Sequence, residues 1–238
     1  YPRRSVPPGE EPSLRYVRAV AVGGPAVLRS RVIPVLLVKD HGLVKTTKFR
    51  DPKYVGDPIN AIRIFNEKEV DELALLDISA TPGARGPNFE LVEDVASECF
   101  MPLAYGGGIR GLEDAKRLFA LGIEKVVLRT AALTDLRSIT AIADYVGSSS
   151  VTVSIDIKRS MLGRPQLFGP GAPLHGSSDW RAFLGNVIDA GAGEIILNAV
   201  DRDGEDGLPA SNSTHIRVFQ KNLSQIGPQR PPDGRHQL

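Results

Sequence analysis

Six short apolar segments recur along the chain and predict six buried strands. Each is rich in Val, Ile and Leu and is apolar on both faces, as parallel strands covered by helices should be. The segments comprise residues 32–38, 73–78, 102–105, 125–128, 151–157 and 194–199. Helical patterns fill the intervals, so strand and helix alternate along the chain.

Capping residues mark the ends of the predicted helices. Asp57 is an N-cap followed by a proline in the first turn, and Ile59, Ile62 and Phe65 then mark one apolar face. Further N-caps are expected at Asn88, Thr134 and Ser178, and helices should stop at Gly122 and Gly191.

This alternation fits two architectures, a (β/α)₈ barrel and a doubly wound sheet. Polar residues follow all six strands. In a barrel all these strand ends surround one mouth, whereas in an open sheet only those beside the switch point share a site. We therefore predict an α/β fold of the TIM-barrel type. The polar residues are Lys39, Asp77, Ser79, Gly106, Gly107, Gly108, Arg129, Thr130, Asp156, Lys158, Asn198, Asp201 and Asp203.

The two ends of the chain do not continue this pattern. Residues 1–30 combine arginines and prolines with a short apolar patch that Gly23, Gly24 and Pro25 interrupt, so they are expected to be an extension outside the fold, either native or translated from outside the natural gene. Residues 31–207 should form barrel units one to six. Residues 208–238 are rich in Pro and Gly and should be poorly ordered, with a helix over 214–223 as the one regular element. The barrel is thus expected to be incomplete at its C-terminus.

Composition excludes several classes of protein. Lys and Arg total 29 against 28 for Asp and Glu, so the net charge of +1 disfavours a nucleic-acid partner. No apolar run is long enough to span a membrane. The single cysteine, Cys99, fits a reducing compartment, and we expect a cytoplasmic protein in which Cys99 is a small core residue on a helix. We expect no cofactor and no metal site.

Asp156 directly follows the apolar pattern of Val151, Val153 and Ile155. An unpaired buried charge is costly, so a carboxylate at the end of such a strand needs a reason. Either a structural partner neutralises it, with Lys158 or Arg159 the nearest in sequence, or it faces a site that requires a carboxylate.

Two other motifs lie directly after strands. Gly106, Gly107 and Gly108 could bring backbone N–H groups close to a phosphate, although a tight structural turn explains three glycines equally well. Asp201 and Asp203 could bind substrate hydroxyls, although a turn with two solvated carboxylates is the commoner fate of such a pair.

Taken together, five strings resemble one family in their order and spacing. They are RVIPVLLVKDHGLVKTTKFRDPKYVGDP, EVDELALLDISA, YGGGIRGLEDAKRLFALGIEKV, VTVSIDIKR and DAGAGEIILNAVDRDG. Over about residues 31–207 the chain resembles the cyclase subunit of imidazole glycerol phosphate synthase. The resemblance implies a (β/α)₈ barrel that works in histidine biosynthesis as a heterodimer with a glutaminase. Such a barrel uses ammonia and a phosphorylated formimino ribonucleotide to form imidazole glycerol phosphate and an aminoimidazole carboxamide ribonucleotide.

The resemblance also assigns roles to residues at the strand ends. Asp156 matches the family's catalytic aspartate of the fifth strand, which acts in acid/base catalysis of ring closure. Lys45 matches the lysine of a mobile loop that closes over substrate, and Asp203 is placed with the catalytic residues. Gly106, Gly107, Gly108 and Thr130 match part of one phosphate site of the family. Asp201, from its place directly after a strand, is expected to bind substrate.

At the opposite ends of the strands, the resemblance implies a gate for ammonia. Its four positions match Arg31, Glu72, Lys125 and Glu194. Two cations and two anions can close a ring of salt bridges and so satisfy charges that would be expensive alone. Glu124 could face the partner subunit.

The chain departs from the family at Leu37. The family's second catalytic aspartate lies in the string Cys-Leu-Asp-Val-Lys of the first strand, whereas residues 35–39 here read Val-Leu-Leu-Val-Lys. Leucine cannot donate or accept a proton, so catalysis by two carboxylates is in doubt. The glycine-rich loops that complete a second phosphate site in the family also have no counterpart here.

Three functions therefore remain open. We predict the cyclase subunit. The first alternative is a partner of a surface-polysaccharide sugar amidotransferase that conducts ammonia without cyclase chemistry, as in a divergent branch with a Leu-rich first strand. The second is an inactive truncated or frameshifted product.

Overall fold

Six parallel strands form the larger part of a barrel in the computed structural model, which describes residues 16–19, 31–81, 85–169, 179–203 and 217–220. Neighbouring strands pair in parallel, in the order in which they follow one another along the chain. They are β2 (Val32–Lys39), β5 (Leu73–Asp77), β6 (Leu103–Gly106), β7 (Lys125–Leu128), β8 (Val151–Arg159) and β10 (Glu194–Ala199). The six strands predicted from the apolar segments are confirmed.

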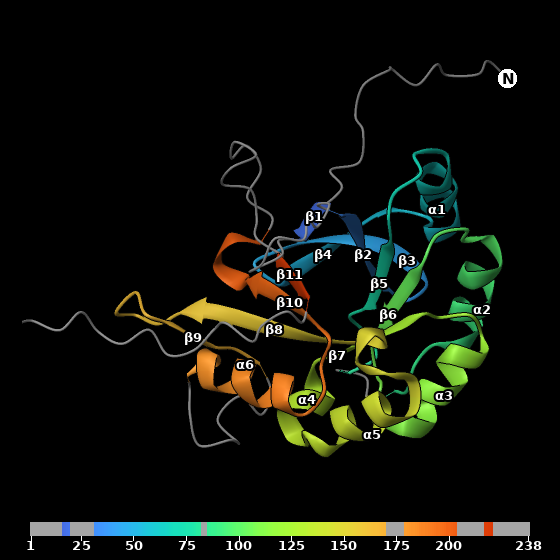
Figure 1. Ribbon diagram of the computed structural model, residues 1–238. Coiled ribbons are helices and arrows are strands. Elements are labelled where there is room, and N and C mark those ends of the chain that lie inside the picture. The colour runs from blue at the N-terminus through green and yellow to red at the C-terminus, as the bar shows by residue number, and fades with distance from the viewer. Residues whose placement is uncertain (1–15, 20–30, 82–84, 170–178, 204–216, 221–238) are drawn as a thin grey trace, which may run out of the picture.

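Two short strands from the terminal segments join the ends of this sheet. Strand β11 (Arg217–Gln220) pairs antiparallel with β10 and parallel with β1 (Tyr16–Ala19), and β1 pairs antiparallel with β2 (Figure 1). The pairing therefore passes through eight strands and returns to the first, which confirms the TIM-type barrel.

Both terminal strands differ from the sequence prediction. Tyr16–Ala19 pairs within the sheet although residues 1–30 were expected outside the fold, and Arg217–Gln220 is a strand although a helix was expected over 214–223. The physical reason is the free edge that β10 and β2 would otherwise present, whose backbone N–H and C=O groups need partners. The exact domain boundaries remain a prediction.

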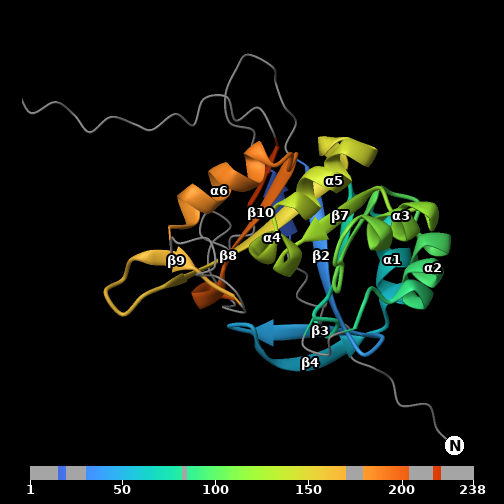
Figure 2. The same cartoon turned by 90° about the horizontal axis from the view of Figure 1, so that it is seen from below.

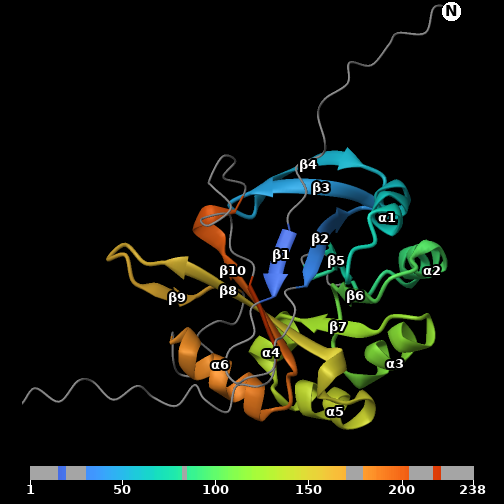
Figure 3. The same ribbon diagram turned by 45° about the horizontal axis from the view of Figure 1, so that its top comes forward.

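The helices lie outside the strands, on the outer face of the barrel (Figures 1 and 3). They are α1 (Pro58–Glu67), α2 (Phe89–Glu98), α3 (Leu112–Ala120), α4 (Thr130–Thr134), α5 (Arg137–Val146) and α6 (Trp180–Asp189). Two short 3₁₀ helices, η1 (Ser148–Ser150) and η2 (Val200–Arg202), precede β8 and follow β10.

Most of the predicted helix ends are confirmed. The carboxylate of Asp57 accepts the Asn60 amide at 3.0 Å, and the side chain of Asn88 caps α2 through the Leu91 amide at 3.2 Å. Gly122 and Gly191 follow the ends of α3 and α6 with φ of 95° and 112°, the left-handed conformation that glycine adopts without strain.

Two predicted caps have other outcomes. Thr134 ends α4 instead of capping α5, because its hydroxyl donates to the carbonyls of Thr130 and Ala131 in its own helix. Ser178 lies outside the described residues, and Asp179 caps α6 by accepting the Arg181 amide at 2.9 Å.

Cys99 follows the last residue of α2 and packs half-buried against the core, whereas the sequence predicted a place on the helix itself. Burial raises the pKa of its thiol, so little of the reactive thiolate forms near neutral pH. This agrees with the expected packing role.

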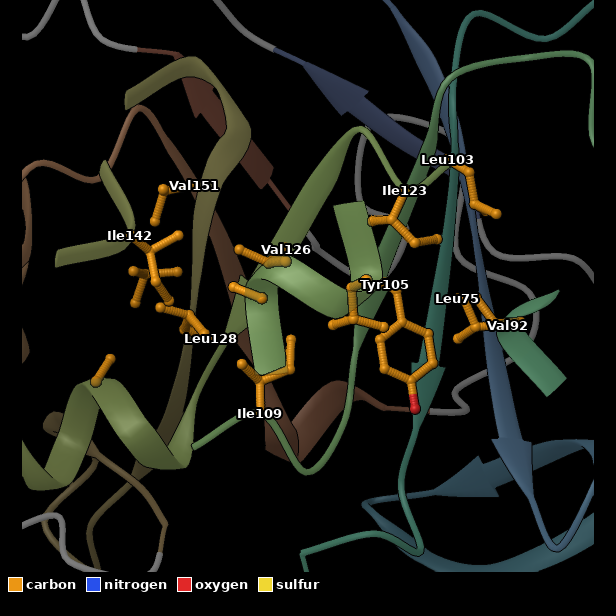
Figure 4. Packing of buried hydrophobic residues seen from close by; sticks show 14 of the residues in the cluster. Leu75, Val92, Leu103, Tyr105, Ile109, Ile123, Val126, Leu128, Ile142 and Val151 are labelled. Carbon is orange, nitrogen blue, oxygen red and sulfur yellow. The ribbon is translucent and has the colours of Figure 1, made fainter. Parts of the chain in front are cut away.

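The main hydrophobic core lies between the strands and the helices. Figure 4 shows part of it, with Leu75 of β5, Tyr105 of β6 and Leu128 of β7 among side chains that include Val92 of α2 and Ile142 of α5. A second cluster fills the inside of the barrel. The strands are thus apolar on both faces, as the sequence pattern predicted.

Two hairpins extend beyond the barrel strands. Strands β3 (Gly42–Thr47) and β4 (Arg50–Gly56) follow β2, and β9 (Pro165–Leu167) pairs antiparallel with the end of β8. The β3–β4 hairpin runs from β2 across the barrel toward the end of β10 (Figures 2 and 3). No helix among the described residues is long and apolar enough to cross a membrane.

Candidate functional site

Four charged side chains close a ring at the N-terminal ends of the strands. The Arg31 guanidinium donates to Glu72 at 2.8 Å and to Glu194 at 2.7 Å. The Lys125 ammonium donates to the same two carboxylates, at 2.7 Å and 3.0 Å. Each anion therefore contacts both cations, and the structure brings together all four residues of the predicted ring.

The ring is largely buried, so its charges depend on one another. The side chains of Glu72 and Glu194 are only 5% and 4% exposed. Two carboxylates this far from water are tolerated because each has two cationic partners. Arg31 directly precedes β2 and Lys125 begins β7, so the two cations lie on opposite sides of the ring and the pairs join distant strands.

The two carboxylates differ in which oxygen atoms accept hydrogen bonds from the cations. Glu72 accepts both cations on Oε2, whereas Glu194 takes Arg31 on Oε1 and Lys125 on Oε2. Burial is the largest influence on the pKa of each carboxyl. It raises the pKa of Glu72 above its ordinary value despite the attraction of Lys125. At Glu194 the attraction of Lys125 and Arg31 outweighs burial, and the pKa is lowered.

Between the ring and the other end of the barrel, the interior is mostly apolar. Strand side chains alternate in direction, so the residues two and four positions after the ring point inward. Among the described side chains that line the interior next to the ring, the buried polar ones come from β8. They are Thr152 and Ser154. The hydroxyl of Thr152 makes no hydrogen bond to any described residue. The apolar lining comprises Ile33, Val35, Ala74, Ala104, Val127 and Ile196, with Leu37 and Leu76 packed against it.

Asp156 lies at the opposite end of this interior, held by two neighbours. Arg129, just after β7, donates through Nε to Oδ2 of Asp156. Asn198 of β10 lies beside Asp156 in register and donates through Nδ2 to Oδ1 at 2.7 Å and to the Ser154 hydroxyl at 3.1 Å. The Asp156 side chain is only 1% exposed.

These contacts identify the partner of the buried carboxylate. It is Arg129 rather than Lys158 or Arg159, the candidates that sequence proximity suggested. Burial is the strongest influence on Asp156 and raises the pKa of its carboxyl, although Arg129 and Asn198 oppose it. A carboxyl with a raised pKa exchanges its proton nearer to neutral pH, as an acid/base group requires.

Sequence reasoning noted Arg129 and Asn198 as polar strand ends but gave them no role. Arg129 follows Val127 by two residues and therefore continues the inward face of β7. Asn198 continues the inward face of β10 in the same way. The alternation of inward positions was the signal that could have placed both beside Asp156.

The three glycines after β6 lie where side chains do not fit. A Cβ at Gly106 would come within 2.8 Å of Leu76, and one at Gly107 within 2.7 Å of Asp77. One at Gly108, where φ is 69°, would lie 2.7 Å from the Arg85 carbonyl. Close packing against β5 and against the loop at Arg85 and Gly86 thus accounts for these glycines, and phosphate binding by them remains a prediction.

The start of α3, which follows these glycines, already carries negative charge. Its first turn contains Glu113 and Asp114, and the Arg110 amide donates to Asp114 at 2.9 Å. These two carboxylates complement the positive end of the helix dipole, which also attracts phosphate groups. Thr130 begins α4, half-buried, and its carbonyl accepts the Thr134 hydroxyl.

Asp203 holds the β3–β4 hairpin across the mouth of the barrel. Its carboxylate accepts the Thr46 hydroxyl at 2.8 Å and the Phe49 amide at 2.9 Å, and its carbonyl accepts the Lys48 amide at 2.9 Å. Lys45, half-buried in β3, lies directly before Thr46. The predicted loop is thus a hairpin that joins the end of β10.

The tip of this hairpin is strained. Lys48 and Phe49 have φ of 51° and 61°, a conformation that two-residue hairpin turns favour but that side chains with a Cβ disfavour. Both strained residues donate their amides to Asp203. The contact to β10 therefore supports a turn whose own sequence does not favour it.

Replacing Asp203 with alanine should release the hairpin. The change removes two hydrogen bonds to a charged group, each worth about 1.5–3 kcal/mol, so exchange of the Phe49 amide should speed up at least about tenfold. Hydrogen exchange followed by NMR measures this directly. Asp201→Ala is the matched control, because Asp201 accepts the Arg159 amide of β8 at 2.6 Å and so bonds to a different strand from the hairpin. Unchanged protection at Phe49 would refute this role of Asp203.

Leu37 lies in β2 beside Leu76 of β5 and packs with the interior cluster. An apolar side chain therefore occupies the position where the resemblance led us to look for a second carboxylate. Among the described residues, no group of three His, Cys, Asp or Glu side chains is placed to hold a metal ion.

Comparison with known proteins agrees with this barrel. The family model described as "Histidine biosynthesis protein" matches residues 31–217. A Pseudomonas aeruginosa protein provisionally named an imidazole glycerol phosphate synthase subunit is 55% identical over 178 residues, which cover 75% of this chain and 71% of that protein. Proteins with the same provisional name from Leptospira borgpetersenii and Vibrio vulnificus are each 49% identical, over 75% of this chain and 70% and 69% of theirs. The chain therefore belongs to the histidine biosynthesis protein family.

Proposed function

We propose that this chain is the synthase subunit of an imidazole glycerol phosphate synthase that receives ammonia from a glutaminase partner. The observation that carries the proposal is the closed ring of Arg31, Glu72, Lys125 and Glu194 at one end of a mostly apolar barrel interior. The family and the names of its relatives support the same reaction.

In this proposal the glutaminase docks over the ring and the ring gates the entry of ammonia. Ammonia is a neutral molecule that is a nucleophile only while unprotonated, and an apolar passage separates it from the protons of bulk water. In the closed ring the two positive and two negative charges balance. If one ion pair separates to open the ring, each carboxylate still contacts at least one cation. A cytoplasmic heterodimer would then carry out the reaction.

At the other end, Asp156 serves as the acid/base group of ring closure. Burial favours its protonated form while Arg129 and Asn198 favour the ionised form, so both forms are accessible to proton transfer. Lys45 and Asp203 act beside it in the mouth. Gly106, Gly107, Gly108, Thr130 and Asp201 contact the phosphorylated substrate.

The decisive experiment combines the purified chain, a glutaminase partner and the formimino ribonucleotide. Product formation is followed with glutamine and, separately, with an ammonium salt as the nitrogen source. The proposal requires turnover with both sources. If the chain binds the nucleotide but forms no product even with the ammonium salt, the cyclase reaction is excluded.

A second candidate is a partner that conducts ammonia to a sugar amidotransferase without cyclase chemistry. The observation that favours it is Leu37, which packs with Leu76 where the proposed reaction would use a second carboxylate. The ring and the apolar interior serve this candidate equally well, because both functions need an ammonia passage.

Replacing Leu37 with aspartate should distinguish the two candidates. If the rest of the mouth holds the cyclase substrate, the added acid/base group should raise ammonium-dependent cyclase turnover by at least about 10²-fold. Leu37→Asn is the matched control, since it has the same shape and polarity but cannot transfer a proton. Folding is checked by thermal unfolding, because a buried carboxylate is costly. A folded variant that binds the nucleotide and gains no turnover favours the ammonia-conducting partner.

A further inference from the structure

Three polar side chains lie in a line along the inward face of β8. Thr152, Ser154 and Asp156 are 2%, 6% and 2% exposed. They alternate with Val153 and Ile155, which pack on the other face of the strand in the outer core. We call Thr152, Ser154 and Asp156 the β8 polar line, because the three share one face of one strand.

The β8 polar line extends through the interior from the charged ring to the opposite end. Thr152 pairs in register with Glu194 of the ring, and Asp156 pairs with Asn198. Successive members are two residues apart along the strand, so their backbone positions are separated by about 6.6 Å. Polar groups therefore recur at regular steps over the whole distance between the ring and Asp156.

The neighbouring strands present apolar side chains at the same depths. Val127 of β7 pairs in register with Thr152, and Ile196 of β10 pairs with Ser154. Both belong to the cluster that fills the inside of the barrel. Among the described side chains between the ring and the level of Asp156, the hydrogen-bonding groups are thus the hydroxyls of Thr152 and Ser154.

The hydroxyl of Thr152 is buried and makes no hydrogen bond to any described residue. Burial separates it from bulk water, so without a partner it lowers stability relative to valine, which has nearly the same shape. The branched shape alone therefore does not explain a threonine here. A small molecule inside the barrel that bonds to the hydroxyl does, as buried waters do for other buried polar groups.

Ser154 and Thr152 are spaced to share such a molecule. The Ser154 oxygen accepts Nδ2 of Asn198 at 3.1 Å, and a hydroxyl has in addition a hydrogen to donate and a second lone pair. Midway between two hydroxyls spaced as their backbone positions are, one heavy atom lies about 3.3 Å from each, close to the length of a hydrogen bond. The spacing suits water or ammonia rather than an organic group.

We propose that the β8 polar line binds a small neutral hydrogen-bonding molecule inside the barrel, which is water in the resting chain and ammonia during transfer from the ring to Asp156. Each hydroxyl replaces part of the hydration that ammonia loses on entering an apolar interior. A hydroxyl is also too weak an acid to protonate ammonia, so the nucleophile is preserved. The ammonia part of this proposal rests on the proposed function, whereas the water part does not.

The first test needs neither a glutaminase nor a nucleotide. A high-resolution crystal structure of the full chain should show an ordered water within about 3.2 Å of Oγ1 of Thr152. Thr152→Val should lose this water and still fold, with an unfolding midpoint close to that of the wild type. An Oγ1 that bonds to a protein group instead, or that has no ordered water beside it, would overturn the proposal.

The second test measures the product formed per glutamine hydrolysed in the complex with a glutaminase. Thr152→Val removes one hydrogen bond from the passage, so this ratio should fall about two- to tenfold. Turnover with an ammonium salt should fall much less, because bulk ammonia reaches Asp156 through the mouth of the barrel. Thr152→Ser keeps the hydroxyl and should retain most of the coupling. Ile155→Val is the matched control, since it removes a methyl group from the outer face of the same strand.

The possible results separate this proposal from the proposed function. If the wild type forms no product even with the ammonium salt, the proposed function fails, and the water test alone decides the proposal. If the wild type is coupled and Thr152→Val is coupled equally well, the β8 polar line does not conduct ammonia and the proposal is overturned. Equal losses in Thr152→Val and Ile155→Val would also overturn it, because any disturbance of β8 would then have the same effect.

Discussion

Asp156→Asn should reduce cyclase turnover by about 10²–10⁴-fold, the usual contribution of a positioned acid/base group. Asparagine has nearly the same shape and can still accept a hydrogen bond from Arg129, but it cannot carry a proton between reacting atoms. Steady-state kinetics with an ammonium salt measure the loss without involving the glutaminase. The thermal unfolding midpoint should stay close to that of the wild type.

The pH dependence of stability gives an independent check on this variant. Because burial raises the pKa of Asp156, the folded protein holds this proton more tightly than the unfolded chain does. The free energy of unfolding contributed by this group is therefore greatest below the ordinary pKa of 3.8 and falls as the pH rises through the raised value. Asp156→Asn should lack this fall. If the variant loses its fold at all pH values, Asp156 is a structural carboxylate.

Lys125→Ala should uncouple glutamine hydrolysis from product formation. The change removes one of the two cations shared by Glu72 and Glu194 and leaves both carboxylates on Arg31 alone. The ring then has a gap and an unbalanced charge, so ammonia can escape before it enters the barrel. Product formed per glutamine hydrolysed should fall by about tenfold, equivalent to 1.4 kcal/mol, while turnover with an ammonium salt falls much less.

Lys125→Met separates the two causes of this leak. Methionine fills most of the space of lysine without its charge, so a leak in Lys125→Ala alone indicates an opening, and a leak in both variants indicates lost charge balance. Equal losses with glutamine and with the ammonium salt in either variant would remove the gate assignment. Failure of every glutaminase tested to bind the wild-type chain would remove the partner.

A feature of this fold could be predicted from the sequence where the residues that produce it lie within a few positions of one another. The six parallel strands were predictable because each carries its own apolar run, and Asp57 and Asn88 were predictable because a cap acts within three residues of itself. The four ring residues were assigned through the family resemblance, and the structure brings them together because each stands at or directly before the start of a barrel strand.

Other features depend on contacts between distant parts of the chain. Arg129 and Asp156 lie 27 residues apart, and the partners nearest in sequence, Lys158 and Arg159, were the wrong ones. Thr46 and Asp203 are separated by 157 residues, so the contact that holds the hairpin leaves no local pattern. The four-residue strand Arg217–Gln220 is too short to be distinguished from a helix by periodicity.

Closure of the barrel through β1 and β11 has a consequence for how the chain folds. Arg18 pairs with Arg217, so the final seam joins segments that lie nearly the whole sequence apart. During synthesis the six parallel strands can assemble one after another, each against its predecessor, whereas this seam has to wait until β11 emerges. Contacts of such long range slow folding, because the entropy of closing a large loop is lost before the contact is gained. Until then β2 and β10 present open edges, and another molecule in the same unfinished state could pair with them.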